Sequence, residues 1–251
     1  MSSLRVAVVY PDLLGTYGDG GNGVILATRA EWRGHDVELV QASSDAALPA
    51  ADVYCLGGGE DGPQVRAARS LIEDGTLTRR VADGAVVLAV CAGYQIVGRS
   101  FPGADGTAHE GVGLLGITTV KGEGPRAVGE VVAQSALVPT ITGFENHGGR
   151  TTLDEGTAPL ATVDAGSGIG NGDGSGTEGA LSGTTRVLGT YLHGPVLARN
   201  PALADLLLSW ALDVDVATLS PVDDNPARYL REERLGAAAR RRRTRRWARR
   251  P

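Results

Sequence analysis

Cys91 is the residue best placed in this sequence to do chemistry. It follows a continuous apolar run at residues 86–90, which is typical of a strand buried on both faces of a parallel sheet. The run breaks at Cys91-Ala-Gly93 and leads into a segment that can begin a helix. A strand, a tight turn with a reactive side chain at its tip, and a helix together form a nucleophile elbow. We therefore predict that Cys91 is a nucleophile, with Gly93 allowing the close backbone approach that the turn needs.

A histidine and a cluster of glycines support this prediction against the simplest alternative, an inert core cysteine. Gly57, Gly58 and Gly59 end a second predicted strand, and His193 ends a late one. A thiol paired with a distant histidine is the pattern of a nucleophile and its base. We predict that His193 takes the proton of the Cys91 thiol and later gives it to the leaving group.

The same turn predicts where a negatively charged intermediate would be stabilised. The backbone N–H of Ala92, directly after the thiol, and an N–H of Gly58 or Gly59 would point at the substrate carbonyl under attack. Such donors stabilise the tetrahedral intermediate of acyl transfer. We therefore predict an oxyanion hole formed by Ala92, Gly58 and Gly59, and acyl transfer through a thioester.

The remaining cysteine and histidines are expected to have other roles. Cys55 lies inside an apolar segment and is expected in the core, while His35 and His109 lie in a turn and a polar loop. His147, in Glu145-Asn-His147, is expected to shape a pocket wall. These spacings predict no metal site, and no Gly-Lys-Ser/Thr follows the glycine cluster, so no phosphate-binding loop is predicted.

Composition is typical of a globular, cytoplasmic protein. Hydrophobic residues make up 42% of the 251 residues and aromatic residues only 4%, so Val, Leu, Ile and Ala must fill the core. No apolar run reaches the length of a membrane span, and no signal peptide is expected because Leu4 already begins a strand. Two cysteines do not make a disulfide framework, which favours a reducing, cytoplasmic location.

The order of elements predicts the fold class. Up to about residue 98, short strands alternate with helices, which gives an α/β fold with a doubly wound, flavodoxin-like, mostly parallel sheet. Sites in such sheets lie at the carboxyl ends of the strands, where Cys91 and the glycine cluster fall. Residues 113–192 look β-rich and lack a long helix. Within them, the glycine-rich residues 165–179 are expected to form a flexible loop or hairpin.

The C-terminal end differs from the rest of the chain. We expect one domain over residues 1–212 and an extension over residues 213–251. Residues 240–250 hold eight arginines and no acid, and the remainder of the chain has 16 basic and 29 acidic residues. Such an acidic body argues against broad nucleic-acid binding by the globular part. The Arg-rich end is expected to be partly disordered.

Motifs along most of the chain resemble those of a known enzyme family, the class I (triad) glutamine amidotransferases, in their cobyric-acid-synthase-like branch. They stand in order at Tyr17-Gly-Asp-Gly-Gly-Asn22, Gly57-Gly-Gly-Glu-Asp-Gly-Pro-Gln64, Cys91-Ala-Gly-Tyr-Gln95, Gly143-Phe-Glu-Asn-His147 and Tyr191-Leu-His-Gly-Pro195. Within that branch the chain is most similar to the glutaminase subunits of lipid II isoglutaminyl synthases. The resemblance covers about residues 4–212 and leaves out the tail.

This resemblance implies both an activity and a partner. The chain would hydrolyse L-glutamine, with Arg126 and Gln95 binding that substrate. A guanidinium suits the α-carboxylate of glutamine because it can pair with it through two hydrogen bonds. Ammonia would pass to a Mur-ligase-like synthetase subunit in a heterodimer, which amidates lipid II. This chain would carry no cofactor, and ATP and Mg would belong to the partner.

One position departs from the family pattern. Most class I glutaminases carry an acid two residues after the histidine, whereas this chain has Pro195 there. The third member of the triad must therefore lie elsewhere in the chain or come from the partner. The resemblance favours the partner, and on that basis we expect the isolated chain to be a poor glutaminase.

Three other functions remain open at this point. The chain could be a stand-alone cysteine γ-glutamyl hydrolase, a non-catalytic binding subunit, or an amidotransferase subunit for another acceptor such as a cobalamin precursor. The Arg-rich tail adds a further question. It could be a solubilising end, a nucleic-acid contact, or an attachment to anionic lipid at the inner face of the plasma membrane, with Trp247 as an interfacial anchor.

Overall fold

The computed structural model describes residues 3–248, with side chains through residue 236. Its central sheet is built from β1 (Ser3–Val9), β2 (Asp36–Ala42), β3 (Val53–Leu56), β4 (Val86–Val90), β13 (Ala180–Leu181) and β14 (Val187–Thr190). The strand order is β13-β14-β4-β3-β1-β2, and all neighbours are parallel except β13 and β14. The predicted mostly parallel α/β sheet is confirmed.

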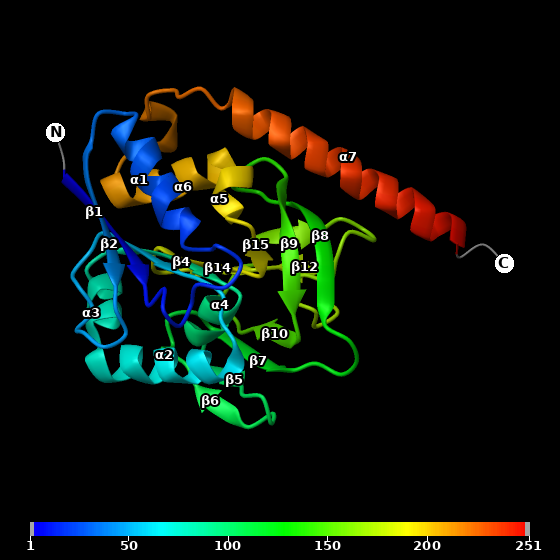
Figure 1. Cartoon of the computed structure of the whole chain (residues 1–251), viewed down its shortest axis with the longest axis horizontal. Helices are drawn as coiled ribbons and strands as arrows, with labels where there is room; N and C mark the ends of the chain where they lie inside the picture. Colours follow the sequence, from blue (N-terminus) through cyan, green and yellow to red (C-terminus); the bar gives the residue numbers. More distant parts are fainter. Residues whose placement is uncertain (1–2, 249–251) are drawn as a thin grey trace.

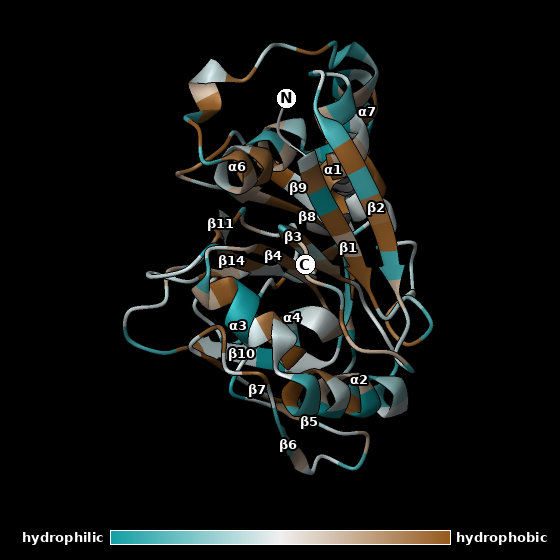
Figure 2. Ribbon diagram, turned by 90° about the vertical axis from the view of Figure 1, so that its left-hand side faces the viewer, coloured by the Kyte–Doolittle hydropathy of each residue, from teal (hydrophilic) through white to brown (hydrophobic). Residues whose placement is uncertain are grey.

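Helices cover both faces of this sheet (Figure 1). One face carries α1 (Gly21–Glu31), α5 (Val196–Arg199) and α6 (Pro201–Leu212), and the other carries α2 (Asp61–Asp74), α3 (Thr76–Ala82) and α4 (Ala92–Ile96). Strands β3, β4 and β14 are buried along their whole length, and Figure 2 shows hydrophobic residues concentrated in the central strands. Burial on both faces explains why these strands read as continuous apolar runs.

Two helices, rather than one, lie between β3 and β4. Gly75 separates α2 from α3 and has a φ of 66°, in the left-handed region that glycine adopts without strain. Its N–H closes α2 on the carbonyl of Leu71. A glycine inside an apolar helical pattern therefore ends one helix and begins the next.

The β-rich region forms two further sheets. The first contains β5 (Ser100–Pro102), β6 (Ala108–Glu110), β7 (Ile117–Lys121) and β10 (Gly149–Leu153), in the order β10-β7-β5-β6. The second contains β8 (Ala127–Gln134), β9 (Ile141–His147), β11 (Ala161–Val163), β12 (Thr177–Glu178) and β15 (Leu192–His193), in the order β12-β11-β8-β9-β15. The chain passes from β14 in the central sheet directly to β15 beside β9. His193 therefore stands at the junction of two sheets.

The glycine-rich residues 165–179 lie in the connection of an antiparallel hairpin between β11 and β12, which confirms the hairpin alternative, and residues 173–176 in this connection are exposed. Asn171 and Glu178 are fully buried. The Tyr94 hydroxyl donates to Asn171 Oδ1 at 3.1 Å, and the Thr190 hydroxyl donates to Glu178 Oε1 at 2.5 Å. Because buried polar groups need such partners, two polar residues fix this segment behind β14 despite its glycines.

The C-terminal extension begins with a short 3-10 helix, η1 (Val216–Thr218), and ends in the long helix α7 (Asn225–Ala248). Several contacts hold it: Arg29 pairs with Asp224 at 2.6 Å, Arg33 Nε donates to the Ser220 carbonyl at 2.8 Å, and Arg231 donates to Asn200 Oδ1 at 2.8 Å. The backbone of α7 is helical through Ala248, and alanine and arginine are both strong helix formers. Among the described residues, no helix is long and apolar enough to cross a membrane.

Candidate active site

Cys91 stands at the tip of the predicted elbow, between β4 and α4. Its φ of 52° lies in a region that residues with a side chain rarely adopt. Gly93 follows at a point where a Cβ atom would come within 2.7 Å of the Leu56 side chain, and its N–H donates to the Gly57 carbonyl at 3.1 Å. The strained turn and the required glycine together hold the thiol above the carboxyl end of the central sheet.

His193 lies beside this thiol and is oriented by a carboxylate of the same chain. Its Nδ1 is 2.7 Å from Oδ2 of Asp19, and both side chains are buried. The other ring nitrogen, Nε2, has no hydrogen-bond partner among the described residues. Since Asp19 holds Nδ1–H, Nε2 is the nitrogen available to exchange a proton with Cys91.

Asp19 overturns the expectation that a partner subunit supplies the third member of the triad. Pro195 does leave the usual local position without an acid. The loop between β1 and α1, however, brings Asp19 to the same place from 174 residues earlier in the sequence. The parallel sheet explains this, because β1 ends at the same edge as β4 and its loop can reach the histidine.

The His193 imidazole is adapted to carry charge. Burial by itself lowers its pKa, but the Asp19 hydrogen bond and the neighbouring Cys91 outweigh burial and raise the pKa from 6.5 to about 10. The ring is therefore charged at neutral pH in this environment. A charged imidazole beside the thiol favours the thiolate, which is the nucleophilic form of cysteine.

The predicted oxyanion hole needs one correction, at Gly58. Its N–H donates to Asp19 Oδ2 at 3.0 Å, so it faces the triad acid and cannot stabilise a substrate oxygen. Gly59 and Ala92 both line the pocket beside Cys91, and no acceptor for either N–H is found among the described residues. These two remain the predicted donors.

Gly58 has a different role, which a substitution can test. A Cβ atom there would lie 2.7 Å from His193 Cε1, so we expect Gly58→Ala to displace the imidazole. Misplacing a reacting group by about 1 Å can cost about 10²-fold in rate, and we expect kcat to fall by about that factor. Gly62→Ala is the matched control because nothing lies within 4 Å of its Cβ position. Equal kcat values for the two variants would contradict this role.

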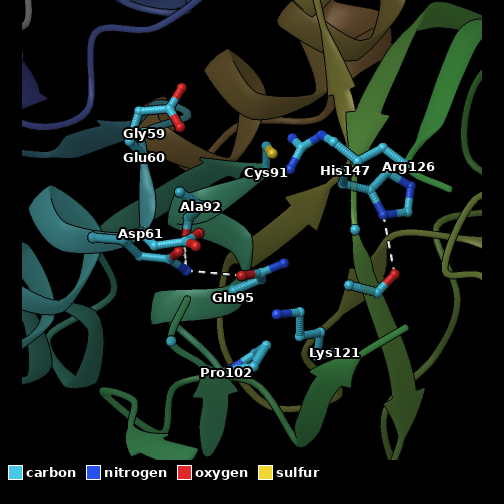
Figure 3. Close-up of a pocket in the computed structure, with 14 residues that line it drawn as sticks. Gly59, Glu60, Asp61, Cys91, Ala92, Gln95, Pro102, Lys121, Arg126 and His147 are labelled. Carbon is cyan, nitrogen blue, oxygen red and sulfur yellow. Dashed lines mark hydrogen bonds between the residues drawn. The ribbon is translucent and has the colours of Figure 1, made fainter. Parts of the chain in front are cut away.

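A cavity of about 100 Å³ opens beside Cys91 (Figure 3). Its lining residues come from the loop after β3 and the start of α2, the elbow and α4, the β5–β6 hairpin, the end of β7 and the loop that follows it, and the turn from β9 to β10: Gly59, Glu60, Asp61, Gln64, Cys91, Ala92, Gln95, Pro102, Gly103, Lys121, Arg126, His147, Gly148 and Gly149. In Figure 3 the Arg126 guanidinium reaches toward Cys91, while Pro102 and Lys121 lie at the other end. The pocket thus places cationic and anionic groups around one thiol, which suits a small zwitterionic substrate.

Arg126 is held in this position by Asn146. Its Nε donates to Asn146 Oδ1 at 3.1 Å, and its Nη2 donates to the Asn146 backbone carbonyl at 2.9 Å. The same carbonyl is 4.0 Å from Cys91 Sγ. Arg126 is exposed to solvent at the pocket, so its remaining N–H groups can receive an anionic ligand.

Gln95 and His147 form the pocket wall. The Gln95 amide accepts from Gln64 at 2.8 Å and donates to the Tyr191 hydroxyl at 3.1 Å. His147 stacks on the Tyr191 ring at 3.7 Å and contacts the Gly149 carbonyl through Nδ1. These bonds fix the wall, and they leave part of the Gln95 amide for a ligand because an NH₂ group has two donors.

Sequence reasoning missed Asp19, Asn146 and Tyr17 as individual site residues. All three stand inside motifs that carried the family resemblance, but their spacing did not reveal a contact with His193 or Arg126. Metal binding gives no further candidate: the described residues contain no group of three or more His, Cys, Asp or Glu side chains that could hold an ion.

Comparison with known proteins agrees with this geometry. The family model for the CobB/CobQ-like glutamine amidotransferase domain matches residues 5–201. Two subunits named GatD, of lipid II isoglutaminyl synthase (glutamine-hydrolyzing), are similar along most of the chain. The Staphylococcus aureus protein is 36% identical, covering 90% of this chain and 92% of its own. The Streptococcus pneumoniae protein is 35% identical, covering 83% and 80%.

The fold also matches a solved structure. The structure of a glutamine amidotransferase from Thermotoga maritima superposes with a TM-score of 0.52, covering 96% of this chain and 99% of that one. The two sequences are only 14% identical. This similarity therefore supports the fold alone.

Proposed function

Because the chain belongs to the CobB/CobQ-like glutamine amidotransferase family, we propose that it is the glutaminase subunit of a lipid II isoglutaminyl synthase. The observation that carries the proposal is the meeting of Cys91, His193 and Asp19 beside a pocket that contains Arg126. Similarity to the two GatD subunits along most of the chain supports the acceptor.

In the proposed reaction the Cys91 thiolate attacks the side-chain amide carbon of glutamine. The N–H groups of Gly59 and Ala92 stabilise the resulting oxyanion. His193 gives a proton to the amide nitrogen, the C–N bond breaks, and ammonia leaves a γ-glutamyl thioester on sulfur. Water, deprotonated by the same imidazole, then breaks the C–S bond and releases glutamate. Asp19 keeps the ring oriented through both steps.

The ammonia would be used by a second protein. We propose a heterodimer with a Mur-ligase-like synthetase subunit that binds ATP and Mg and activates the α-carboxyl of D-glutamate in lipid II. Ammonia attacking that activated carboxyl gives D-isoglutamine. This chain has no phosphate-binding loop of the Gly-Lys-Ser/Thr type, which is consistent with nucleotide binding by the partner.

Reconstitution tests the proposal. The chain would be mixed with a purified Mur-ligase-like synthetase, lipid II, ATP and Mg, with glutamine as the only nitrogen source, and amidated lipid II would be measured by mass spectrometry. We expect amidation only when both proteins are present. Glutamine hydrolysis without amidation, while the synthetase still uses free ammonia, would assign this chain to another acceptor.

Arg126 gives a prediction about substrate binding. Losing a hydrogen bond to a charged group costs about 1.5–3 kcal/mol, so we expect Arg126→Ala to lower kcat/KM for glutamine about tenfold or more, chiefly through KM. Arg66→Ala is the control, because Arg66 does not line the pocket and makes an exposed ion pair with Asp45. A KM that stays unchanged in Arg126→Ala would remove Arg126 from the substrate site.

The Arg-rich tail fits the lipid-linked acceptor. We propose that it attaches the complex to an anionic membrane surface, where each basic residue contributes about 1 kcal/mol at low screening. Co-sedimentation with anionic vesicles should then be lost when residues 237–251 are removed. Equal sedimentation of the full and shortened chains would argue against membrane attachment.

A further inference from the structure

Tyr17 is an exposed aromatic residue in a strained position at the active site. Half of its surface is open to solvent, and its φ of 63° lies in the left-handed region. It stands two residues before Asp19, in the loop that carries the triad acid. Strain and exposure of a bulky side chain both cost free energy, so something in the fold must hold Tyr17 there.

Two contacts hold it. The Tyr17 ring lies on the His193 imidazole, with ring centroids 4.7 Å apart and the planes inclined at 53°. Its hydroxyl accepts a hydrogen bond from Asn146 Nδ2 at 2.5 Å. Tyr17 therefore covers the catalytic histidine while it is tied to β9 on the other side of the site.

Asn146 extends this connection to Arg126. A guanidinium can only donate, so Asn146 Oδ1 must face Arg126 and its NH₂ group must face Tyr17. The orientation of one amide is thus set by both neighbours. If the guanidinium moves, the Asn146 amide is no longer held with its NH₂ group toward Tyr17. If Tyr17 moves, the amide can rotate and its hydrogen bond to Arg126 is weakened.

We propose that Tyr17 is a positioning residue that couples glutamine binding at Arg126 to the His193–Asp19 pair through Asn146. The proposal rests on the proposed glutaminase function. With the connection intact, Arg126 is held ready for the substrate carboxylate, and the ring keeps water away from the His193–Asp19 hydrogen bond. Tyr17 is not one of the residues that line the pocket, and its hydroxyl is bonded to Asn146, so its influence on binding passes through Asn146.

The test is a double-mutant cycle on glutamine binding, measured by calorimetry in chains that carry Cys91→Ala so that no turnover occurs. Tyr17→Phe keeps the ring and removes the hydroxyl. Loss of one hydrogen bond is expected to raise Kd about two- to tenfold. In the Arg126→Ala background the same change should leave Kd as it is, because the route from Tyr17 to the ligand is already broken. Tyr229→Phe, on exposed α7, should change nothing.

The pH profile of kcat distinguishes a positioning role of Tyr17 from a role in folding alone. Removing the whole ring with Tyr17→Ala in the active chain exposes His193, so the pH profile of kcat should shift, whereas Tyr17→Phe should keep the wild-type profile. A Tyr17→Phe chain with wild-type Kd, or an equal rise in Kd in both backgrounds, would overturn the coupling. Failure of the proposed function looks different: Arg126→Ala by itself would then bind glutamine as tightly as the parent.

Discussion

Asp19→Asn is expected to lower kcat for glutamine hydrolysis by about 10⁴, as removal of the corresponding acid does in serine-protease triads. Asparagine keeps the size of the side chain, but it can present its NH₂ group to His193 Nδ1 and favour the wrong tautomer. It also removes the negative charge that stabilises the imidazolium. Because Asp19 additionally accepts from Gly58, part of the loss would come from a displaced glycine loop.

Asp12→Asn is the matched control for this prediction. Asp12 lies in the same loop after β1, is exposed, and bonds only to Ser44 at the surface. We expect its kcat to equal that of the parent chain. A kcat in Asp19→Asn within a few-fold of the parent would show that Asp19 is not the acid of the triad.

The same variant has a predicted effect on stability as a function of pH. The pKa of His193 is raised in the folded protein from 6.5 to about 10. The contribution of the charged His193 to the free energy of unfolding is therefore fully present below pH 6.5 and is lost as pH rises toward 10. In Asp19→Asn the pKa of His193 in the folded protein should be lower, so this contribution to stability should be lost at a lower pH. The difference between the unfolding free energies of the two chains should therefore be largest near pH 6 and should shrink as pH rises toward 10. A difference that stays constant over this range would contradict the raised pKa.

Cys91→Ala is expected to abolish glutamine hydrolysis while leaving the fold intact. The side chain supplies the only atom that can form the thioester, and alanine fits at the elbow because the Cβ atom is retained. In the reconstituted complex, amidation from glutamine should stop while amidation from added ammonium salt continues. That second reaction shows that the partner remains functional.

Cys55→Ala provides the comparison for this second prediction. Cys55 lies in β3, and burial raises the pKa of its thiol to about 12, so it cannot supply a thiolate near neutral pH. Its replacement should reduce stability slightly and leave the rate per folded molecule unchanged. Appreciable ammonia release by Cys91→Ala, or loss of it in folded Cys55→Ala, would remove Cys91 from the mechanism.

The elements that sequence could predict are those with a repeating physical pattern. Fully buried strands such as β4 appear as apolar runs, and the elbow at Cys91 follows from the break in such a run. The acid of the triad has no comparable signal. Asp19 lies in a glycine-rich loop, and its contact with His193 depends on where β1 lies in the central sheet and on how the chain passes from β14 to β15.

The role of Gly58 shows the same limit at atomic scale. Sequence placed the glycine cluster at the correct end of β3, but it could not decide which N–H faces the substrate. In the structure the N–H of Gly58 donates to Asp19, whereas Gly59 lines the pocket. The two roles differ only in the direction in which neighbouring peptide N–H groups point. Likewise, the anchoring of residues 165–179 depends on hydrogen bonds of Asn171 and Glu178 to residues of α4 and β14, which composition does not reveal.

The central claim is that one chain holds a complete Cys–His–Asp triad that forms a thioester with glutamine, and trapping that thioester tests it most directly. The chain would be mixed with glutamine, quenched with acid during turnover, digested, and analysed by mass spectrometry. We predict a γ-glutamyl adduct on the peptide that contains Cys91, none on the peptide with Cys55, and almost none in Asp19→Asn. Glutamine turnover without an adduct on Cys91, or an adduct on Cys55, would contradict the account.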